Sequence, residues 1–217
     1  NFINKEWNAL NILMQNASTV GLLDLNILSD KKGDDFSFFE NLENKRFKFL
    51  YLLGSDNLDF KKDNEFIVYQ GSHGDRGAEI ADIVLPSAAY TEQNGLYENL
   101  EGRVQECKKA SYPIGEALED WKIFNRIIKK IGSKDELNKF DQLRKEVLDM
   151  IPNFFEINQL SSVLENKHNK FKTNFISEDI IVRELDYYFT NSISRASKTM
   201  SDCRQILHRN KKNGTNN

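Results

Sequence analysis

Apolar positions follow recognisable periods along the first half of the chain. Between residues 5 and 21 they recur at steps of three and four, which predicts an amphipathic helix. Three short apolar runs then predict β-strands, each stopped by a glycine or a proline: residues 47–53, 66–70 and 83–85. Nearly continuous apolar character is typical of strands buried in a parallel sheet. Because loops and helical stretches separate these strands, we predict an α/β fold with parallel strands flanked by helices.

Two further helices are predicted in the second half of the chain. The first presents one apolar face and ends near Gly132, with Trp121, Phe124, Ile127, Ile128 and Ile131 on that face. The second ends at Pro152 and carries Leu137, Phe140, Leu143, Val147 and Ile151 on its face. Little periodicity is present in residues 29–46, which we interpret as a polar connection, or in residues 87–115, which we interpret as an irregular segment.

We therefore predict three parts along the chain. Residues 1–152 form the α/β region, residues 153–186 are a polar irregular connection, and residues 187–217 are a C-terminal docking segment followed by a basic tail. The docking segment begins with three aromatic residues, Tyr187, Tyr188 and Phe189. We expect it to lie as an extended strap, with the rings as anchors and Arg195 paired to an acidic group or a carbonyl. A solvated tail remains the alternative for the basic end.

Size and charge narrow the classes of function. The 217 residues, 25.2 kDa, have room for one large domain or two small ones. Lys and Arg number 30 against 33 Asp and Glu, so there is no overall positive field and no nucleic-acid partner is expected. No apolar run approaches the roughly 20 residues of a membrane helix, so no direct membrane insertion is expected. Cys107 and Cys203 are too few for a disulfide scaffold or a four-cysteine cluster within this sequence.

The most suggestive local motif is the glycine loop, which runs from Gly71 to Gly77 directly after the second predicted strand. Glycine loops in this position often approach phosphates closely. The spacing Gly-x-x-Gly-x-x-Gly is not the dinucleotide motif, and no Lys-Ser or Lys-Thr follows as in a P-loop. A structural turn is therefore favoured over a phosphate cradle. We expect at least one of Gly71, Gly74 and Gly77 to have a positive φ, so that a β-branched replacement is poorly tolerated.

Other reactive side chains are scattered without a recognisable catalytic or metal-binding spacing. The possible metal ligands are His73, Cys107, His168, Cys203 and His208. Neither the Ser72-His73 pair nor Cys107 lies in a nucleophile motif. Four carboxylates, Glu92, Glu98, Glu101 and Glu106, could include an acid–base pair. Capping or ion pairing is favoured for them, with Arg103 as the expected partner or as a group bound to a carbonyl. We predict no catalytic, cofactor-binding or metal-binding residue.

One stretch carries a family resemblance. Residues 66–105 read FIVYQGSHGDRGAEIADIVLPSAAYTEQNGLYENLEGRVQ, and the part from Ala78 onward resembles the signature of the molybdopterin oxidoreductase superfamily. Its flank VYQGSHGDRG is similar to one branch, the large iron–sulfur (75 kDa) subunits of respiratory complex I, NADH:ubiquinone oxidoreductase. Further segments resemble that branch in order: residues 7–11, 20–25, 49–56, 119–123, 140–144 and 188–200. The chain departs from the superfamily pattern at Leu96, where the pattern has Thr.

The resemblance implies a structural role. It implies a part of the matrix arm of mitochondrial complex I, at the matrix side of the inner membrane, supporting NADH-to-ubiquinone electron transfer without a redox centre of its own. The implied partners are other matrix-arm subunits, including the N-terminal half that carries the iron–sulfur cysteines. The start at Asn1 is expected to reflect a split gene or part of a longer chain. A fragment of a catalytic molybdopterin-dependent oxidoreductase and a free-standing α/β binding module remain the alternatives.

Overall fold

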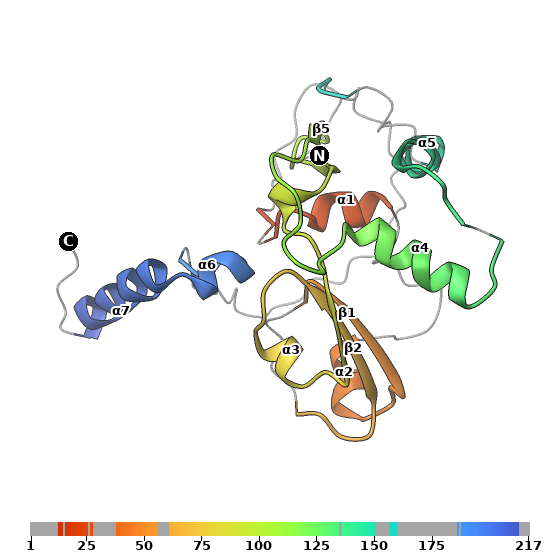
Figure 1. Ribbon diagram of the computed structural model, residues 1–217. Helices are drawn as coiled ribbons and strands as arrows, with labels where there is room; N and C mark the ends of the chain where they lie inside the picture. The colour runs from red at the N-terminus through yellow and green to blue at the C-terminus, as the bar shows by residue number, and fades with distance from the viewer. Residues whose placement is uncertain are drawn as a thin grey trace, which may run out of the picture.

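A three-stranded parallel sheet forms the centre of the molecule. The structure is a computed structural model that describes residues 13–14, 16–25, 27, 38–55, 61–134, 136–150, 157–159, 186 and 188–212. The strands are β1 (Phe49–Leu53), β2 (Phe66–Gly71) and β3 (Ile83–Pro86), in the order β1-β2-β3 (Figure 1). All three strands lie where the apolar runs predict them. The predicted α/β class with parallel strands is therefore confirmed.

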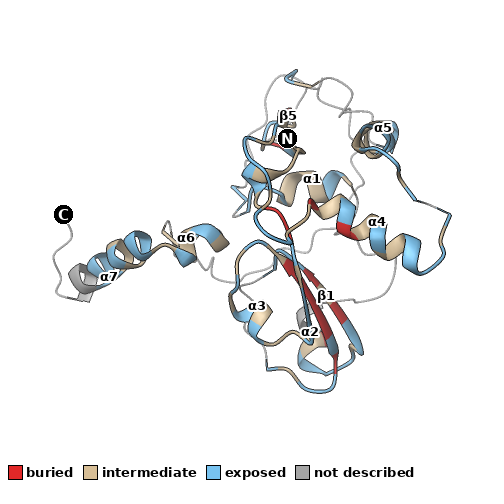
Figure 2. Ribbon diagram, viewed as in Figure 1, coloured by how far each residue is buried: buried red, intermediate tan, exposed pale blue. Residues whose placement is uncertain are grey.

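One face of this sheet holds the main core. Side chains alternate along β1 and β2, so that Leu50, Leu52, Ile67 and Tyr69 point to the same side and form one buried cluster. Two short helices, α2 (Phe38–Glu43) and α3 (Arg76–Glu79), contribute Leu42 and Ala78 to its cover. Figure 2 shows that buried positions concentrate in these strands. The continuous apolar runs of the sequence are explained by this burial.

The opposite face of the sheet is covered only in part. Helix α4 (Asp120–Lys130) packs on it through Phe124, whose ring centroid lies 5.4 Å from that of Tyr51. At the beginning of the strands the face is open. Phe49 is 55 % exposed and stacks on Phe66, which is 45 % exposed, at 6.3 Å between ring centroids. Large apolar side chains are therefore exposed side by side at this end of the sheet.

A second, smaller unit is built on a β-hairpin that the sequence pattern does not predict. Strands β4 (Gly95–Glu98) and β5 (Val104–Cys107) pair antiparallel within the segment expected to be irregular. Each strand has only four residues, too few for a clear alternation, and Gly102 closes the turn with φ +78°. Val104 is buried beside Leu96, the residue that departs from the superfamily pattern.

Helices α1 (Thr19–Asp24) and α5 (Phe140–Met150) lie beside the hairpin core, which is packed by Leu25, directly after α1, and by Val147 of α5. Helices α4 and α5 lie where their apolar faces predict them, and Gly132 follows α4 with φ +75°. Of the predicted helix over residues 5–21, residues 19–21 are confirmed as part of α1, but the described residues before Thr19, Leu13 and Met14 among them, are not helical. Its residues 5–12 lie outside the described residues. Helix α2 falls in the segment expected to be a polar connection.

The C-terminal segment is helical, not an extended strap. It forms α6 (Ser192–Ala196) and α7 (Lys198–Lys212), and α7 points away from the sheet in Figure 1. Asn191 starts α6: its side chain accepts a hydrogen bond from the Ser194 backbone N–H at 2.9 Å. The pairing expected for Arg195 is confirmed, because its Nε lies 2.8 Å from Oδ2 of Asp75 in the glycine loop. Tyr187, one of the three expected anchors, lies outside the described residues.

The aromatic anchor Phe189 packs within the C-terminal segment itself. The Arg204 guanidinium lies 4.7 Å from the centroid of its ring and also pairs with Asp186. Among the described helices, none combines the length and the apolar character needed to cross a membrane.

Replacing Arg195 with alanine is expected to release α6 from the glycine loop and lower the free energy of unfolding by about 1 kcal/mol. The value is modest because Asp75 is 37 % exposed, although the Arg195 side chain is only 14 % exposed. Limited proteolysis should show faster cleavage between residues 186 and 198. Lys198→Ala, at an exposed position a little further along the chain, is the matched control and should leave the cleavage rate unchanged.

Candidate functional site

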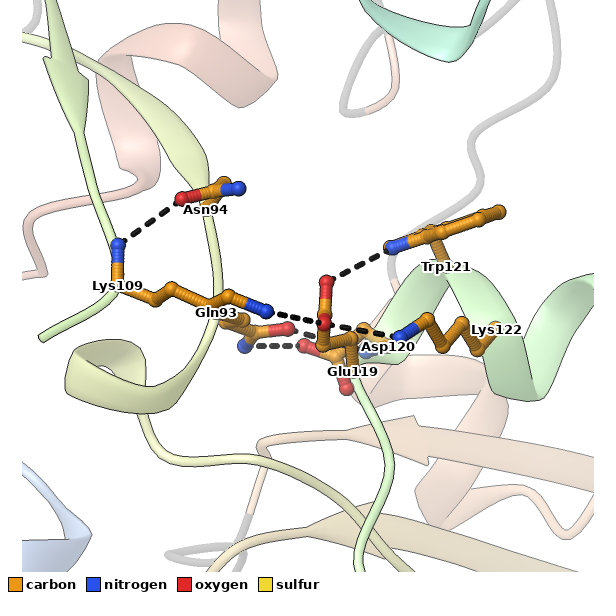
Figure 3. A network of polar contacts seen from close by, with 7 residues as sticks. All are labelled: Gln93, Asn94, Lys109, Glu119, Asp120, Trp121 and Lys122. Atoms are coloured by element: carbon orange, nitrogen blue, oxygen red, sulfur yellow. Dashed lines mark hydrogen bonds and ion pairs between the residues drawn. The ribbon is translucent and has the colours of Figure 1, made fainter. Parts of the chain in front are cut away.

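The densest group of polar contacts lies where α4 begins, against the end of β2 (Figure 3). Asp120 accepts a hydrogen bond from Gln70 Nε2 at 2.6 Å through Oδ1 and from Gln93 Nε2 at 2.7 Å through Oδ2. Its own backbone N–H donates to Gln93 Oε1 at 3.0 Å. Gln70 is fully buried and accepts a hydrogen bond from the Tyr51 hydroxyl. Asp120 thus links the central strand, the loop before the hairpin and the first turn of α4.

The adjacent residue, Glu119, collects a second set of donors. Its side chain is only 6 % exposed, and it binds Lys109 Nζ at 3.1 Å, Lys122 Nζ at 3.0 Å and Trp121 Nε1 at 3.0 Å. Burial alone would raise the pKa of Glu119, but the hydrogen bonds from Trp121, Lys122 and Lys109 outweigh it and lower that pKa. The Glu119 carboxylate therefore stays ionised. It binds one donor that precedes α4 in the chain, Lys109, and two donors in the first turn of α4, Trp121 and Lys122.

We call Gln70, Gln93, Lys109, Glu119, Asp120, Trp121 and Lys122 the α4 hub. Each of its four carboxylate oxygens accepts at least one hydrogen bond from the protein. A general base or a metal ligand needs an acceptor that faces a substrate or an ion. In the hub the carboxylate oxygens accept hydrogen bonds from the protein's own donors. Its geometry therefore suits holding α4 against the sheet and the neighbouring loop, and not acid–base chemistry.

The glycine loop is a structural turn. Tyr69 donates its hydroxyl hydrogen bond to the His73 carbonyl at 2.7 Å, and the His73 ring Nδ1 lies 2.9 Å from Ser72 Oγ. The expected positive φ is wrong for this loop: among the described glycines it occurs at Gly54, Gly102, Gly115 and Gly132. Gly71 is needed for a different reason. A Cβ there would lie 2.2 Å from Tyr69 Oη, because the Tyr69 ring crosses directly over the glycine.

The four candidate carboxylates do not form one acid–base site. Glu92 caps a short turn by accepting from the Ala89 backbone N–H at 3.0 Å. Glu106 pairs with Arg144 at 2.9 Å, and Glu101 is an exposed group 4.0 Å from Arg103. Glu98 differs from these three, because it is only 5 % exposed and its Oε2 has no hydrogen-bond partner among the described residues. The interpretation as a capped or ion-paired carboxylate is wrong for Glu98.

Burial and the neighbouring Asp24 carboxyl raise the pKa of Glu98 to about 7. Because the pKa of Glu98 is higher in the folded than in the unfolded chain, its contribution to stability is fully present at pH values below the unfolded pKa. That contribution is lost as the pH rises through the folded pKa of about 7. Solvent screening reduces the full effect, so we expect wild-type protein to lose about 1–2 kcal/mol between pH 5 and 8 relative to Glu98→Gln. Urea unfolding at a series of pH values measures this. The exposed Glu101→Gln on the same hairpin should follow the wild-type curve.

Arg103 binds a carbonyl, which is one of its two expected environments. Its Nη1 donates to the Asn158 carbonyl at 2.8 Å, and the Asn158 N–H donates to the Val104 carbonyl at 2.8 Å. The guanidinium thus holds the turn at residues 157–159 against β5. Its side chain is 32 % exposed, so it is not the deeply buried ion pair that the sequence also suggested.

Replacing Arg103 with alanine is expected to cost about 1 kcal/mol and not the larger penalty of a broken buried pair. Chemical denaturation of the full chain measures the change. Lysine at position 103 keeps the charge but lacks the planar guanidinium, and should recover part of the loss. A cost above about 3 kcal/mol would place Arg103 in a desolvated site and contradict this expectation.

The cysteine and histidine candidates are dispersed. Cys107 and Cys203 are free thiols on β5 and α7, and His208 is exposed on α7. His168 lies outside the described residues. Within the described ranges, no three His, Cys, Asp or Glu side chains are grouped so as to hold a metal ion.

Sequence reasoning missed the roles of Gln70, Gln93 and Asp24. The sequence did contain a signal for the role of Gln70. Gln70 follows four apolar residues in a strand predicted to be buried, and a buried amide needs partners. Nothing in the sequence indicated which side chains these partners are, because Gln93 and Asp120 lie 23 and 50 positions further along.

Comparison with known proteins identifies the family. The family model described as molybdopterin oxidoreductase matches residues 1–130, more than half of the 217 residues. The chain belongs to the molybdopterin oxidoreductase family. A second family model, described as the C-terminal part of an NADH-ubiquinone oxidoreductase subunit, matches residues 152–203 of this family member.

Relatives of this molybdopterin oxidoreductase family member are named as 75 kDa or 78 kDa subunits of NADH-ubiquinone oxidoreductase. The chain is 38 % identical over 209 residues to the NADH-ubiquinone oxidoreductase 75 kDa subunit of Reclinomonas americana. It is 37 % identical over 217 residues to the mitochondrial 78 kDa subunit of Candida albicans, and 39 % identical over 216 residues to the mitochondrial 78 kDa subunit of Neurospora crassa. These matches cover 94 % of this chain but only 30 %, 28 % and 27 % of the relatives. The chain thus spans less than a third of their length.

The family name implies a pterin cofactor, whose phosphates need free N–H donors or cations. In the glycine loop, the donor at the start of α3 is taken by a carboxylate of the chain itself. The Asp75 carboxylate accepts the Arg76 N–H at 2.8 Å at the start of α3, and Arg195 binds the same carboxylate. A carboxylate in this place repels a phosphate. The described residues of the loop therefore do not fit the pterin group.

Proposed function

We propose that the chain is a structural part of the large 75 kDa-type subunit of mitochondrial complex I, NADH:ubiquinone oxidoreductase. One observation carries the proposal: the molybdopterin oxidoreductase match at residues 1–130 is followed by a match at residues 152–203 to the C-terminal part of an NADH-ubiquinone oxidoreductase subunit. The second match supports the complex I branch over a catalytic member of the family. The names of the relatives support the same branch.

The role we propose is assembly, without a redox centre in this chain. The α4 hub supports it, because its carboxylates bind the protein's own donors. The misfit between the glycine loop and a pterin phosphate also supports it. The division into residues 1–152, 153–186 and 187–217, with no catalytic residue in any part, belongs to this proposal.

Two open apolar surfaces are suited to the proposed partners. The first is the row at the beginning of the strands, where Phe49, Phe66 and Ile83 are about half exposed. The second lies along α7, where Met200, Ile206 and Leu207 are 39 %, 58 % and 40 % exposed. We assign the first surface to the cluster-bearing N-terminal half and the second to another matrix-arm subunit, on the matrix side of the inner membrane. Both surfaces would be buried on assembly.

Purification through a tag on this chain tests the proposal. The chain should comigrate on a native gel with a large assembly that oxidises NADH, and electron paramagnetic resonance should detect iron–sulfur signals from other parts of that assembly. Elemental analysis decides against the catalytic alternative if molybdenum and tungsten stay far below one atom per chain. Stoichiometric molybdenum or tungsten would overturn the structural role. A monomeric chain with no copurifying protein would favour a free-standing module instead.

A further inference from the structure

A groove of about 680 Å³ lies between the end of β3, the segment 115–118 and the second half of α4. Most of the side chains that line it are apolar: Leu85, Pro86, Leu118, Ile123, Ile127 and Ile131. The last of these is 73 % exposed, so the apolar lining continues to the surface of the molecule. The groove is separate from the two open apolar surfaces assigned to partners, and an apolar groove beside a helix is a common place for a partner segment to bind.

Helix α4 presents two apolar stripes to different neighbours. Trp121 and Phe124 pack against aromatic rings of α5 and β1. Ile123, Ile127 and Ile131 follow one another at steps of four along α4 and its C-terminal cap, so they form a second stripe, which lines the groove. The second stripe runs from a buried residue, Ile123, to an open one, Ile131. The helix therefore carries more apolar surface than its contacts within the described residues cover.

Two cations border the second stripe. Arg126 and Lys130 both line the groove one turn apart on α4, and both are exposed. Neither makes a hydrogen bond or an ion pair with any described residue. The helix dipole explains a lysine in the last turn of α4, but it does not explain Arg126, which precedes that turn. The acid among the lining residues is Glu116, which comes from the segment 115–118 and not from the helix. The α4 side of the groove is therefore positive.

We propose that this groove binds a segment of another protein that combines apolar with acidic side chains. Its apolar side chains would cover Ile127 and Ile131, and its acids would face Arg126 and Lys130. Complementary charge fixes the register of such a segment, while the apolar stripe supplies the area that is buried. A compact anion such as phosphate would leave the isoleucines open and would meet the negative end of the α4 dipole. The acidic chemistry of the partner does not depend on the assembly role, and only its identity as a matrix-arm subunit rests on the proposed function.

Fluorescence anisotropy of the full chain with two synthetic helical peptides tests the groove. One peptide carries leucine on one face and glutamate beside it, and its twin has lysine in place of each glutamate. We expect the glutamate peptide to bind at least about tenfold more tightly than its twin. The double variant Arg126→Glu, Lys130→Glu should abolish this preference. The double variant Lys129→Glu, Lys134→Glu changes the net charge equally at exposed positions outside the lining, and should keep the preference. No binding of the glutamate peptide, or the same loss in both double variants, would overturn the proposal.

The apolar part of the groove has its own matched pair of variants. Ile131→Ser should weaken binding of the glutamate peptide about tenfold, because it removes the open end of the stripe. Met150→Ser on α5 should leave the affinity unchanged, although Met150 is 72 % exposed and thus as open as Ile131. Circular dichroism should show the wild-type fold for both variants, since neither side chain is buried. Equal affinities of the two variants would show that charge alone attracts the peptide and would contradict the proposal.

A photo-reactive residue at position 131 of the tagged chain identifies the partner segment within the purified assembly. Mass spectrometry of the cross-linked peptide should find an excess of Asp and Glu next to apolar residues. A basic peptide, a lipid, or no cross-link in an assembled chain would overturn the inference. A chain that proves monomeric would overturn the proposed function instead, and the peptide titration would still decide whether the groove binds acidic segments.

Discussion

Replacing Asp120 with alanine is expected to lower the free energy of unfolding by about 3–5 kcal/mol, the largest effect we predict for one side chain. The change leaves Gln70 Nε2 without its acceptor, and it leaves Gln93 Nε2 with only the longer contact of 3.4 Å to the Ala88 carbonyl. Gln70 is fully buried, so water cannot replace the lost partner. The orphaned buried donor of Gln70 costs about 1–3 kcal/mol, the weakened bonding of the half-buried Gln93 adds to this, and loss of the negative charge at the start of α4 adds up to about 1 kcal/mol.

Urea denaturation followed by circular dichroism measures this loss. Asp141→Ala is the matched control, because Asp141 also lies in the first turn of a helix but is exposed. It should change stability by less than about 0.5 kcal/mol. A double variant, Gln70→Leu with Asp120→Ala, removes both the donor and the acceptor, and should recover part of the loss. Equal effects of Asp120→Ala and Asp141→Ala would show that the α4 hub does not hold the helix to the sheet.

Gly71→Ala is the second large effect, and we expect it to cost about 3 kcal/mol. The added methyl group would lie 2.2 Å from Tyr69 Oη and 2.5 Å from Cζ of the same ring. Tyr69 is only 2 % exposed and belongs to the main core cluster, so the ring has no free space into which to move. Displacement of the ring also breaks its hydrogen bond to the His73 carbonyl. Thermal unfolding of the full chain measures the loss.

The glycine loop provides its own control for this prediction. At Gly74 an added Cβ meets no atom within 4 Å, so Gly74→Ala should be close to neutral. In a Tyr69→Leu background the Gly71→Ala change should cost less than about 1 kcal/mol, because the ring that opposes the methyl group is gone. If Gly74→Ala proves as harmful as Gly71→Ala, backbone freedom and not ring packing is the reason for the glycines.

Sequence reasoning succeeded where one strong local pattern decides the structure. The three parallel strands are runs of apolar residues with a clear stop, and α4 has one continuous apolar face closed by Gly132. It failed where the elements are short. Strands β4 and β5 have four residues each with mixed polarity, unlike the all-apolar four-residue β3, and α2 has six, so their sequences do not distinguish them from loops. The C-terminal segment was misjudged because the Asn191 cap matters more there than the absence of an apolar period.

The sequence by itself determined the family and the parallel sheet, because these depend on motifs and periods within short windows. Only the tertiary structure decided the α4 hub, the ring over Gly71 and the burial of Glu98 without a cation. Each of these depends on packing, and two of them join positions from separate elements: Gln70 with Asp120, and Glu98 with Asp24. Whether a carboxylate is neutralised, hydrogen-bonded or left without a partner depends on burial and on the groups around it. Those quantities arise only when the chain has packed.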